Sequence, residues 1–381
     1  MLNRILGRIA AVFLLVGLLV GALPAQAADD PTYLTTTPAG PPDAQPHTDG
    51  TTVVWQVHQS QVKESPRDVY AANLTDRKVF PVATGPTDQG DQDIDGGVVV
   101  WADGARDPAT GLGVFTIRGR DLATGRELEI GSALGESPLP AISGNWVVWR
   151  SQTGDAWSIK ARNIATMSEP FTLVRRVGGS VALQPPSIDG DRVVWLESLE
   201  RTMDGRAIWD WQFFTCQVTD CTATVVSEAK DSPFVPTSYD VGGDFVVYDA
   251  FTPFHSVTAV DLRTRTSKVM PGKGYVPTTD GRYVFWESWQ SSLIVDLQGY
   301  DLQTESTFPV SADTGFNRVP TARHGKLAWQ RGTGPVEIHA APIVSFLPSA
   351  RRLDASTTIP GSTYFPETGH YLSAGFQQFW A

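Results

Sequence analysis

The sequence repeats itself seven times, and this internal repeat constrains the fold more than any other feature. Each copy has a glycine and then a short apolar run that ends in an aromatic residue. Successive aromatic residues are 46, 48, 46, 53, 38 and 43 positions apart: Trp55, Trp101, Trp149, Trp195, Tyr248, Trp286 and Trp329. In five copies a proline stands nine residues before the aromatic one. A period of roughly 40–50 residues indicates a repeat protein, in which each unit is one supersecondary structure.

Every unit contains the signals of four β-strands. The strand that ends in the aromatic residue is followed by a polar loop and by a second strand, which ends in a pair such as Asp121-Leu122 or Asp261-Leu262. A short polar turn leads into a third strand, for example residues 127–130, and the segment around the proline adds a fourth. Beyond residue 27 no long apolar run has helical spacing. We therefore expect an all-β chain with four antiparallel strands in each unit.

Seven such units predict a seven-bladed β-propeller that extends from about residue 30 to residue 345. A four-stranded sheet has two apolar faces and cannot cover both by itself, so neighbouring sheets stack around an axis. The recurrent aromatic ring is then expected to pack between blades, where it would bury about 150–250 Å². The alternative is that these rings form a row that binds a ligand.

The two ends of the repeat region suggest how the ring closes. The seventh unit has a strand around Pro320, the strand of Trp329 and a third strand over residues 336–343, but no regular fourth strand follows. Residues 33–37 precede the first repeat proline and are similar to residues 307–310. We expect this N-terminal strand to become the outermost strand of the last blade, because the pairing would remove an open sheet edge.

These repeats resemble those of the TolB-like propellers. That family has a proline, an Asp-Gly turn, an apolar strand and an Asp-Leu-x-Thr-Gly hairpin. Here residues 121–125 match the hairpin, and the Asp-Gly turn occurs at Asp49, Asp95, Asp189 and Asp280. The resemblance covers the whole repeat region, and its motifs are structural. It implies an exported scaffold that binds partners through its two faces or its central channel.

The first 27 residues are typical of a signal peptide. Arg4 and Arg8 precede an uncharged apolar run over residues 9–23, and residues 25–27 supply a small-residue cleavage site. The run is short for a hydrocarbon core of about 30 Å, which favours cleavage over a retained membrane anchor. No later stretch is apolar and long enough to span a bilayer. We expect a monomer in the periplasm, on the cell surface or outside the cell.

The C-terminal end differs in composition from the repeats. Residues 346–362 are polar and are interpreted as a linker. Residues 363–381 are similar to the opening of an LGFP-type repeat, which occurs in bacterial cell-wall-associated proteins, but the glycine-rich part of that module does not follow. We interpret this end as an incomplete LGFP-like segment.

The two cysteines, Cys216 and Cys221, are separated by four residues that include the turn-forming pair Thr219-Asp220. A hairpin at this point would bring the two sulfur atoms together. An exported protein meets an oxidising environment, so we predict a disulfide. A metal site is the alternative, but no histidine lies within 30 residues of the pair.

The net charge and the absence of common catalytic motifs restrict the functions that this sequence can have. The formal net charge is −11, or −13 without the first 27 residues, and no cluster of Lys and Arg is present. This argues against nucleic acid or an anionic membrane as a partner. The sequence contains no Gly-x-Ser-x-Gly, His-Glu-x-x-His or dinucleotide motif. The favoured hypothesis is a non-catalytic scaffold that binds a protein or a glycan, and the alternative is a propeller glycan lyase or hydrolase.

Three groups of residues are candidates for a site. His47 and His324 lie near expected inner strands and could face the channel, where the alternative hypothesis would use them with acidic residues. Trp209 and Trp211 could stack on sugars, although packing in the core is the simpler interpretation. The densest acidic cluster leads into the second repeat and consists of Asp88, Asp91, Asp93 and Asp95. Its oxygen atoms could hold Ca²⁺, which is the only cofactor considered, or the cluster could be a solvated loop.

Overall fold

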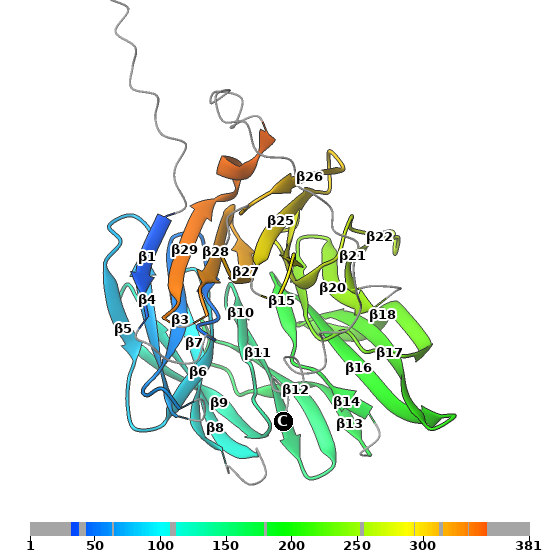
Figure 1. Ribbon diagram of the computed structural model, residues 1–381. Helices are drawn as coiled ribbons and strands as arrows, with labels where there is room; N and C mark the ends of the chain where they lie inside the picture. The colour runs from blue at the N-terminus through cyan, green and yellow to red at the C-terminus, as the bar shows by residue number, and fades with distance from the viewer. Residues whose placement is uncertain are drawn as a thin grey trace, which may run out of the picture.

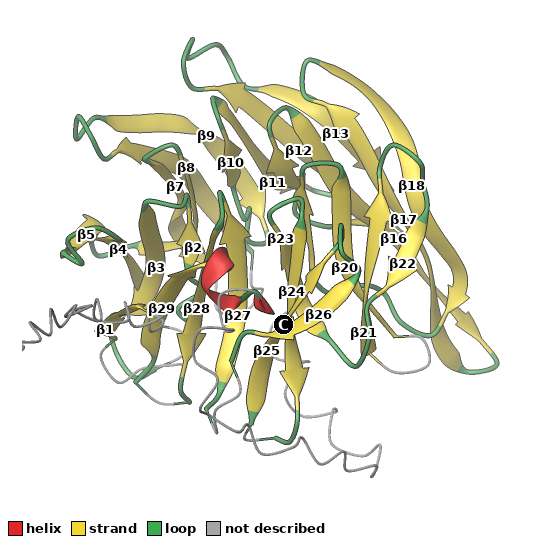
Figure 2. Ribbon diagram, turned by 90° about the horizontal axis from the view of Figure 1, so that it is seen from above, coloured by secondary structure: helices red, strands yellow, loops and turns green. Residues whose placement is uncertain are grey.

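The computed structural model describes residues 32–37, 43–62, 65–106, 112–178, 181–251, 255–292, 294–311, 315–333 and 335–348. The expected signal peptide, the LGFP-like segment and all but the first three residues of the expected linker lie outside these ranges. Within them, seven antiparallel sheets are arranged in a ring around a central axis (Figures 1 and 2). The fold is the seven-bladed β-propeller that the repeat predicts.

The first three blades follow the predicted four-strand pattern, with each strand paired to the next in the sequence. Blade 1 contains β2 (His47–Thr48), β3 (Thr52–His58), β4 (Arg67–Asn73) and β5 (Val79–Ala83). Blade 2 contains β6 (Asp88–Asp95), β7 (Val98–Arg106), β8 (Gly113–Asp121) and β9 (Glu127–Gly135). Blade 3 contains β10 (Ala141–Ser143), β11 (Trp146–Thr153), β12 (Ala156–Asn163) and β13 (Phe171–Val177).

Blade 4 has one strand more than predicted. It contains β14 (Val181–Leu183), β15 (Ser187–Asp189), β16 (Arg192–Met203), β17 (Arg206–Gln217) and β18 (Asp220–Ser232). β16 extends over 12 residues: its first three residues pair with the inner strand β15, and residues 197–199 pair with the additional strand β14.

The remaining blades return to the regular pattern. Blade 5 contains β19 (Tyr239–Gly242), β20 (Phe245–Phe251), β21 (His255–Asp261) and β22 (Ser267–Val269). Blade 6 contains β23 (Tyr275–Thr279), β24 (Tyr283–Trp289), β25 (Val295–Asp301) and β26 (Ser306–Pro309). Blade 7 contains β27 (Asn317–Arg323), β28 (Lys326–Arg331), β29 (Glu337–Pro342) and the N-terminal strand β1 (Thr32–Thr36).

The ring closes as predicted, because β1 pairs antiparallel with β29 as the outermost strand of blade 7. Leu34 of β1 is buried in a cluster that also contains Trp55 of blade 1 and Ile338 of β29. A 3₁₀ helix, η1 (Ile343–Phe346), follows β29, and Phe346 packs against Trp329. None of the helices in the described ranges is long and apolar enough to cross a membrane.

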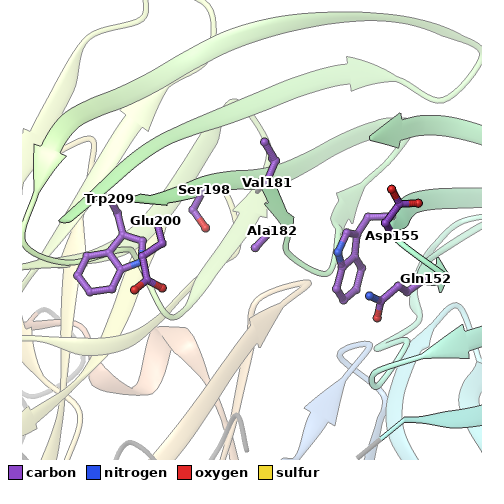
Figure 3. A pocket seen from close by; sticks show the side chains of 8 residues that line it. Gln152, Asp155, Val181, Ala182, Ser198, Glu200 and Trp209 are labelled. Atoms are coloured by element: carbon purple, nitrogen blue, oxygen red, sulfur yellow. The ribbon is translucent and has the colours of Figure 1, made fainter. Parts of the chain in front are cut away.

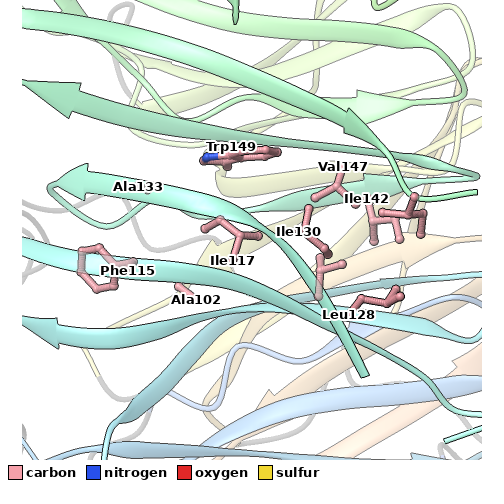
Figure 4. Close-up of a cluster of buried hydrophobic side chains, with 11 residues drawn as sticks. Ala102, Phe115, Ile117, Leu128, Ile130, Ala133, Ile142, Val147 and Trp149 are labelled. Carbon is pink, nitrogen blue, oxygen red and sulfur yellow. The ribbon is translucent and has the colours of Figure 1, made fainter. Parts of the chain in front are cut away.

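All seven repeated aromatic residues are buried, with at most 5% of their surface exposed. Between blades 2 and 3, Trp149 lies over Ile117, Ile130 and Ala133 (Figure 4). A Cβ atom on Gly131 would come within 2.5 Å of the Trp149 ring, so only glycine allows this approach. The aromatic residues are therefore the packing contact between blades, as predicted, and do not form a ligand-binding row.

The Asp-Gly turns of the repeat also join neighbouring blades. Asp49 caps its own turn by accepting bonds from the backbone N–H groups of Thr51 and Thr52. Its second oxygen accepts the N–H of Gly97, in the equivalent turn of blade 2, at 2.8 Å. The same bond joins Asp95 to Gly144 and Asp189 to Gly243. The motif therefore shapes a hairpin and positions the next blade.

Cys216 and Cys221 form the predicted disulfide across the turn between β17 and β18. Replacing both by serine should lower the free energy of unfolding by about 2 kcal/mol, the value for closing so short a loop in the chain-entropy model. Thermal unfolding of the double variant and of the wild-type protein, each with and without dithiothreitol, measures this. The reductant should destabilise only the wild-type protein. An equal response of both would contradict the assignment.

Candidate functional site

The inner strands surround an axial cavity of about 310 Å³. Each blade contributes to its wall the residue eight positions before its repeated aromatic residue: His47, Asp93, Ala141, Ser187, Asp240, Thr278 and Thr321. This ring contains one imidazole and two carboxyl groups, and the other members are small or carry a hydroxyl group. Polar side chains with different chemistry thus meet around the axis, although they are far apart in the sequence.

Several residues at the entrance of this cavity have a left-handed backbone. Val276 and Val319 have φ angles of 48° and 51°, which are costly for a β-branched residue, and Gln45, Asp91 and Leu139 at equivalent positions are also left-handed. Buried side chains of the preceding blade hold two of them. Glu287 accepts the N–H of Val319 at 2.9 Å, and Gln56 accepts that of Asp91 at 3.1 Å.

Arg323 lines the axial cavity and bridges several blades. It lies at the end of β27 in blade 7, and its guanidinium donates to the carbonyl oxygens of Ile94, Ile142 and Ile188, in blades 2, 3 and 4. The nearest carboxylate oxygen of Asp93 is 3.7 Å away. Burial lowers the pKa of Arg323, but Asp93 and Asp240 outweigh it and the net shift is upward. One side chain therefore ties four blades together at the axis.

The two carboxyl groups of the axial cavity differ electrostatically. Asp93 accepts from His47 Nδ1 at 3.1 Å and from the N–H of Ile142 at 2.9 Å. Although burial opposes it, the charges of Arg323 and His47 hold the pKa of Asp93 below its ordinary value. Asp240 accepts from Thr278 and Ser187, yet burial raises its pKa. The surroundings thus shift the pKa values of the two carboxyl groups in opposite directions.

Because the pKa of Asp93 is lowered, we predict that this residue contributes to the stability of the fold at neutral pH but not in acid. Its stabilising contribution should be complete above the ordinary carboxyl pKa of 3.8 and should be lost as the pH falls below that value. We expect Asp93→Asn to lower the melting temperature at pH 7 and to have a smaller effect at pH 3. Thermal unfolding of both proteins at pH 7, 5 and 3 checks this. The same difference at every pH would contradict it.

The acidic cluster lies in β6, which is the innermost strand of blade 2, and the solvated-loop interpretation was wrong. Asp91, Asp93 and Asp95 are buried because they face neighbouring inner strands, which a single sequence repeat does not show. Arg67 binds Asp88 at 2.8 Å and Asp91 at 3.0 Å. Within the described residues, no group of three or more His, Cys, Asp or Glu side chains is arranged to hold a metal ion.

The structure does not bring the two candidate histidines together. His47 lines the axial cavity, and 34% of its side chain is exposed. His324 follows Arg323 in the turn after β27, away from the cavity entrance, and binds Asp95 at 2.8 Å. Each imidazole therefore pairs with a different aspartate of β6.

The two candidate tryptophans differ in burial. Trp211 is buried against Phe213 and Tyr248, so it belongs to the core. Trp209 is only half-buried and lines a second cavity, of about 360 Å³, which lies between blades 3 and 4. We call this cavity the blade 3–4 groove (Figure 3); its other lining residues are Gln152, Asp155, Trp157, Val181, Ala182, Ser198 and Glu200.

Sequence reasoning did not find this groove, and it overlooked Trp157 as a site residue. One signal pointed to the region: the spacing of 53 residues between Trp195 and Tyr248 is the longest in the repeat. The extra length forms the long strands β16, β17 and β18. The axial role of Arg323 left no signal, since its position in the repeat is occupied by aspartate in four other copies.

The fold and the two cavities define the chain as a seven-bladed β-propeller with a closed ring. Comparison of the sequence with protein-family models gave no match, and neither did comparison with curated proteins. Solved structures with a similar fold include the β-propeller domain of the Trilobed protease from Pyrococcus furiosus, which has an open velcro topology. Its TM-score is 0.53 at 11% sequence identity, and the match covers 82% of this chain and 94% of that one.

Two further solved structures are similar to this chain. Oligogalacturonate lyase from Vibrio parahaemolyticus has a TM-score of 0.52 at 11% identity, covering 82% of this chain and 94% of that one. TolB from Acinetobacter baumannii has a TM-score of 0.46 at 12% identity, covering 72% of this chain and 66% of that one. At these identities the likeness is one of fold alone. The closer resemblance of the repeats to TolB-like repeats stays a prediction from the sequence.

Proposed function

We propose that this protein is an exported, non-catalytic β-propeller that binds a protein or a glycan at the cell envelope or outside the cell. The observation that carries the proposal is the use of the ionisable groups around the axis. His47 and Asp93 bind each other, and Arg323 donates to three carbonyl groups. Asp240 accepts from two hydroxyl groups and from the N–H of Thr279. These bonds hold the ring in shape, which is what a rigid binding scaffold needs.

The blade 3–4 groove has the opposite character and supports binding. Asp155 and Glu200 line it, both are exposed, and the contacts within the described part of the chain give neither carboxylate a bonding partner. They stand beside two half-buried tryptophans, Trp157 and Trp209. Aromatic surface next to unused hydrogen-bond acceptors is the composition of a recognition site.

Export is supported by the N-terminal segment and by the disulfide. Residues 1–27 have the pattern of a cleaved signal peptide. The bond between Cys216 and Cys221 fits an oxidising compartment. N-terminal sequencing of the protein recovered from the parent cells tests this part, and we expect it to begin at Ala28.

The binding function is tested by offering the purified protein a panel of polysaccharides and peptides, and by measuring both retention and breakdown. We expect retention without turnover, unchanged by His47→Ala and His324→Ala. Turnover that these replacements abolish would overturn the proposal in favour of an enzyme.

One observation favours the second candidate, a propeller lyase or hydrolase. Asp93 and Asp240 line the same axial cavity with pKa values shifted in opposite directions, as acid–base catalysis requires. In such an enzyme Asp240 would be the proton donor and the His47–Asp93 pair the base. Asp240→Asn would then abolish any turnover found in the panel. Turnover that survives this replacement would exclude Asp240 from the chemistry.

A further inference from the structure

We infer that the blade 3–4 groove binds an uncharged oligosaccharide of at least two pyranose units. This inference rests on the proposed binding function and specifies its ligand and its place. The groove departs from the sevenfold pattern, because its floor is β14, the additional strand found in blade 4 alone among the described sheets. A local departure from a regular repeat is where a function added to the scaffold is expected.

Each wall of the groove is a pair of side chains that face each other across two strands. In blade 3, Gln152 of β11 pairs with Trp157 of β12. In blade 4, Glu200 of β16 pairs with Trp209 of β17. Figure 3 shows Trp209 and Glu200 at one end of the groove, with Asp155 and Gln152 at the other. The groove thus has an indole and a hydrogen-bonding group at both ends.

The floor between the walls is formed by short side chains. Ala182 of β14 pairs with Ser198 of β16, and both line the groove. These short side chains leave room for a ligand that lies across the floor and reaches both indole rings. A volume of about 360 Å³ is within the usual range for a small-molecule site, which is about 300–1,000 Å³.

The polar groups of the groove identify the chemistry of its occupant. The carboxylates of Asp155 and Glu200 can only accept hydrogen bonds when ionised, so the ligand must present donors such as hydroxyl groups. Gln152 Oε1 is buried and lacks a hydrogen-bond partner among the described residues. The groove has no Lys or Arg among its lining residues, so the only charged side chains that line it, Asp155 and Glu200, would repel a polyanionic glycan.

The surroundings of Trp157 favour a sugar over a basic peptide as the ligand of the groove. The guanidinium of Arg150 already lies over the Trp157 ring, 4.7 Å from its centroid. A second cation on this ring would be repelled by Arg150, whereas the apolar C–H face of a pyranose would not. Hydroxyl donors beside an apolar face, repeated along the ligand, match the two indole rings and the acceptors beside them.

The inference is tested by isothermal titration calorimetry with four neutral tetrasaccharides built from glucose, mannose, xylose and N-acetylglucosamine. Tetragalacturonate and tetralysine serve as the anionic and basic arms. We expect a neutral tetrasaccharide to bind, with affinity about tenfold weaker in Trp209→Ala and in the double variant Asp155→Asn, Glu200→Gln. Trp146→Ala, which replaces a half-buried tryptophan of blade 3 outside the groove, is the matched control, and the melting temperature of each variant checks its fold.

The possible outcomes distinguish a failure of this inference from a failure of the proposed binding function. If a tetrasaccharide binds equally well to the wild-type protein, to Trp209→Ala and to the double variant Asp155→Asn, Glu200→Gln, the groove is not the binding site, although the protein is still a glycan-binding scaffold. If tetralysine binds the wild-type protein and this binding is lost in the same variants, the groove is a binding site but its ligand is not a sugar. Failure of every neutral tetrasaccharide to bind would overturn the inference, and failure of the wider panel of polysaccharides and peptides would also remove the proposed function.

Discussion

Replacing Arg323 by methionine should lower the free energy of unfolding by about 3–5 kcal/mol, the usual cost of leaving a buried charge unpaired. The variant would lose the donors to three carbonyl oxygens on three different blades. It would also leave Asp93 with His47 as its only charged neighbour among those that lower its pKa. For about 300 residues this corresponds to a fall in melting temperature of roughly 5–8 °C. Differential scanning calorimetry at pH 7 measures it.

Two further variants make this result specific. Arg206→Met removes an exposed arginine from the first position of β17 and should change the melting temperature little. The double variant Arg323→Met, Asp93→Asn should be destabilised less than the sum of its single replacements, because the second removes the charge that the first leaves unpaired. Additive effects would contradict the coupling of these side chains at the axis.

Deleting residues 28–37 should open the ring and produce the second large effect. Loss of Leu34 from its cluster corresponds by itself to about 2–5 kcal/mol. The deletion also removes the backbone bond from Thr37 to Val336 and the pairing of β1 with β29, which becomes an exposed sheet edge. We expect a lower melting temperature in calorimetry and self-association in size-exclusion chromatography with light scattering.

Tyr33→Ala provides the control for this deletion. Tyr33 lies on the same strand, but 48% of its surface is exposed, so its removal should leave the ring closed and the protein monomeric. Leu34→Ala should be destabilised without self-association, because the backbone pairing of β1 remains. A deletion variant that is monomeric and melts with the wild-type protein would show that β1 is dispensable.

The blade architecture was accessible from the sequence because its signals are local and recur. The Val-Val-Trp strands, the Asp-Gly turns and the polar hairpins each describe a short stretch of chain, and Trp149 and Trp195 occupy the predicted places between blades. The closing strand and the disulfide followed from the same reasoning, one from a missing strand in the last unit and the other from a turn of four residues.

The candidate sites were harder, since their residues come from different blades. The sequence placed Asp93 and Asp95 in a loop, whereas their burial results from the approach of β2, β10 and β27 to the axis. His47 and His324 were both expected near inner strands, but His47 lines the axial cavity whereas His324 lies in the turn after β27 and is not among the residues that line this cavity. Trp209 and Trp211 differ by two positions and pack against the same core cluster, yet Trp211 is buried whereas Trp209 is half-buried and also lines a groove.

The amino-acid sequence by itself determined the all-β class, the number of blades, the order of strands within each blade and the way the ring closes. These properties depend on hydrogen bonding and burial within one unit of the repeat, which seven similar copies record. Only the tertiary structure decided that Arg323 lies at the axis, that Asp93 and Asp240 differ in pKa, and that Trp157 and Trp209 share a groove. Such properties arise from the rotation of one blade against the next, which brings side chains about 50 or more residues apart into contact.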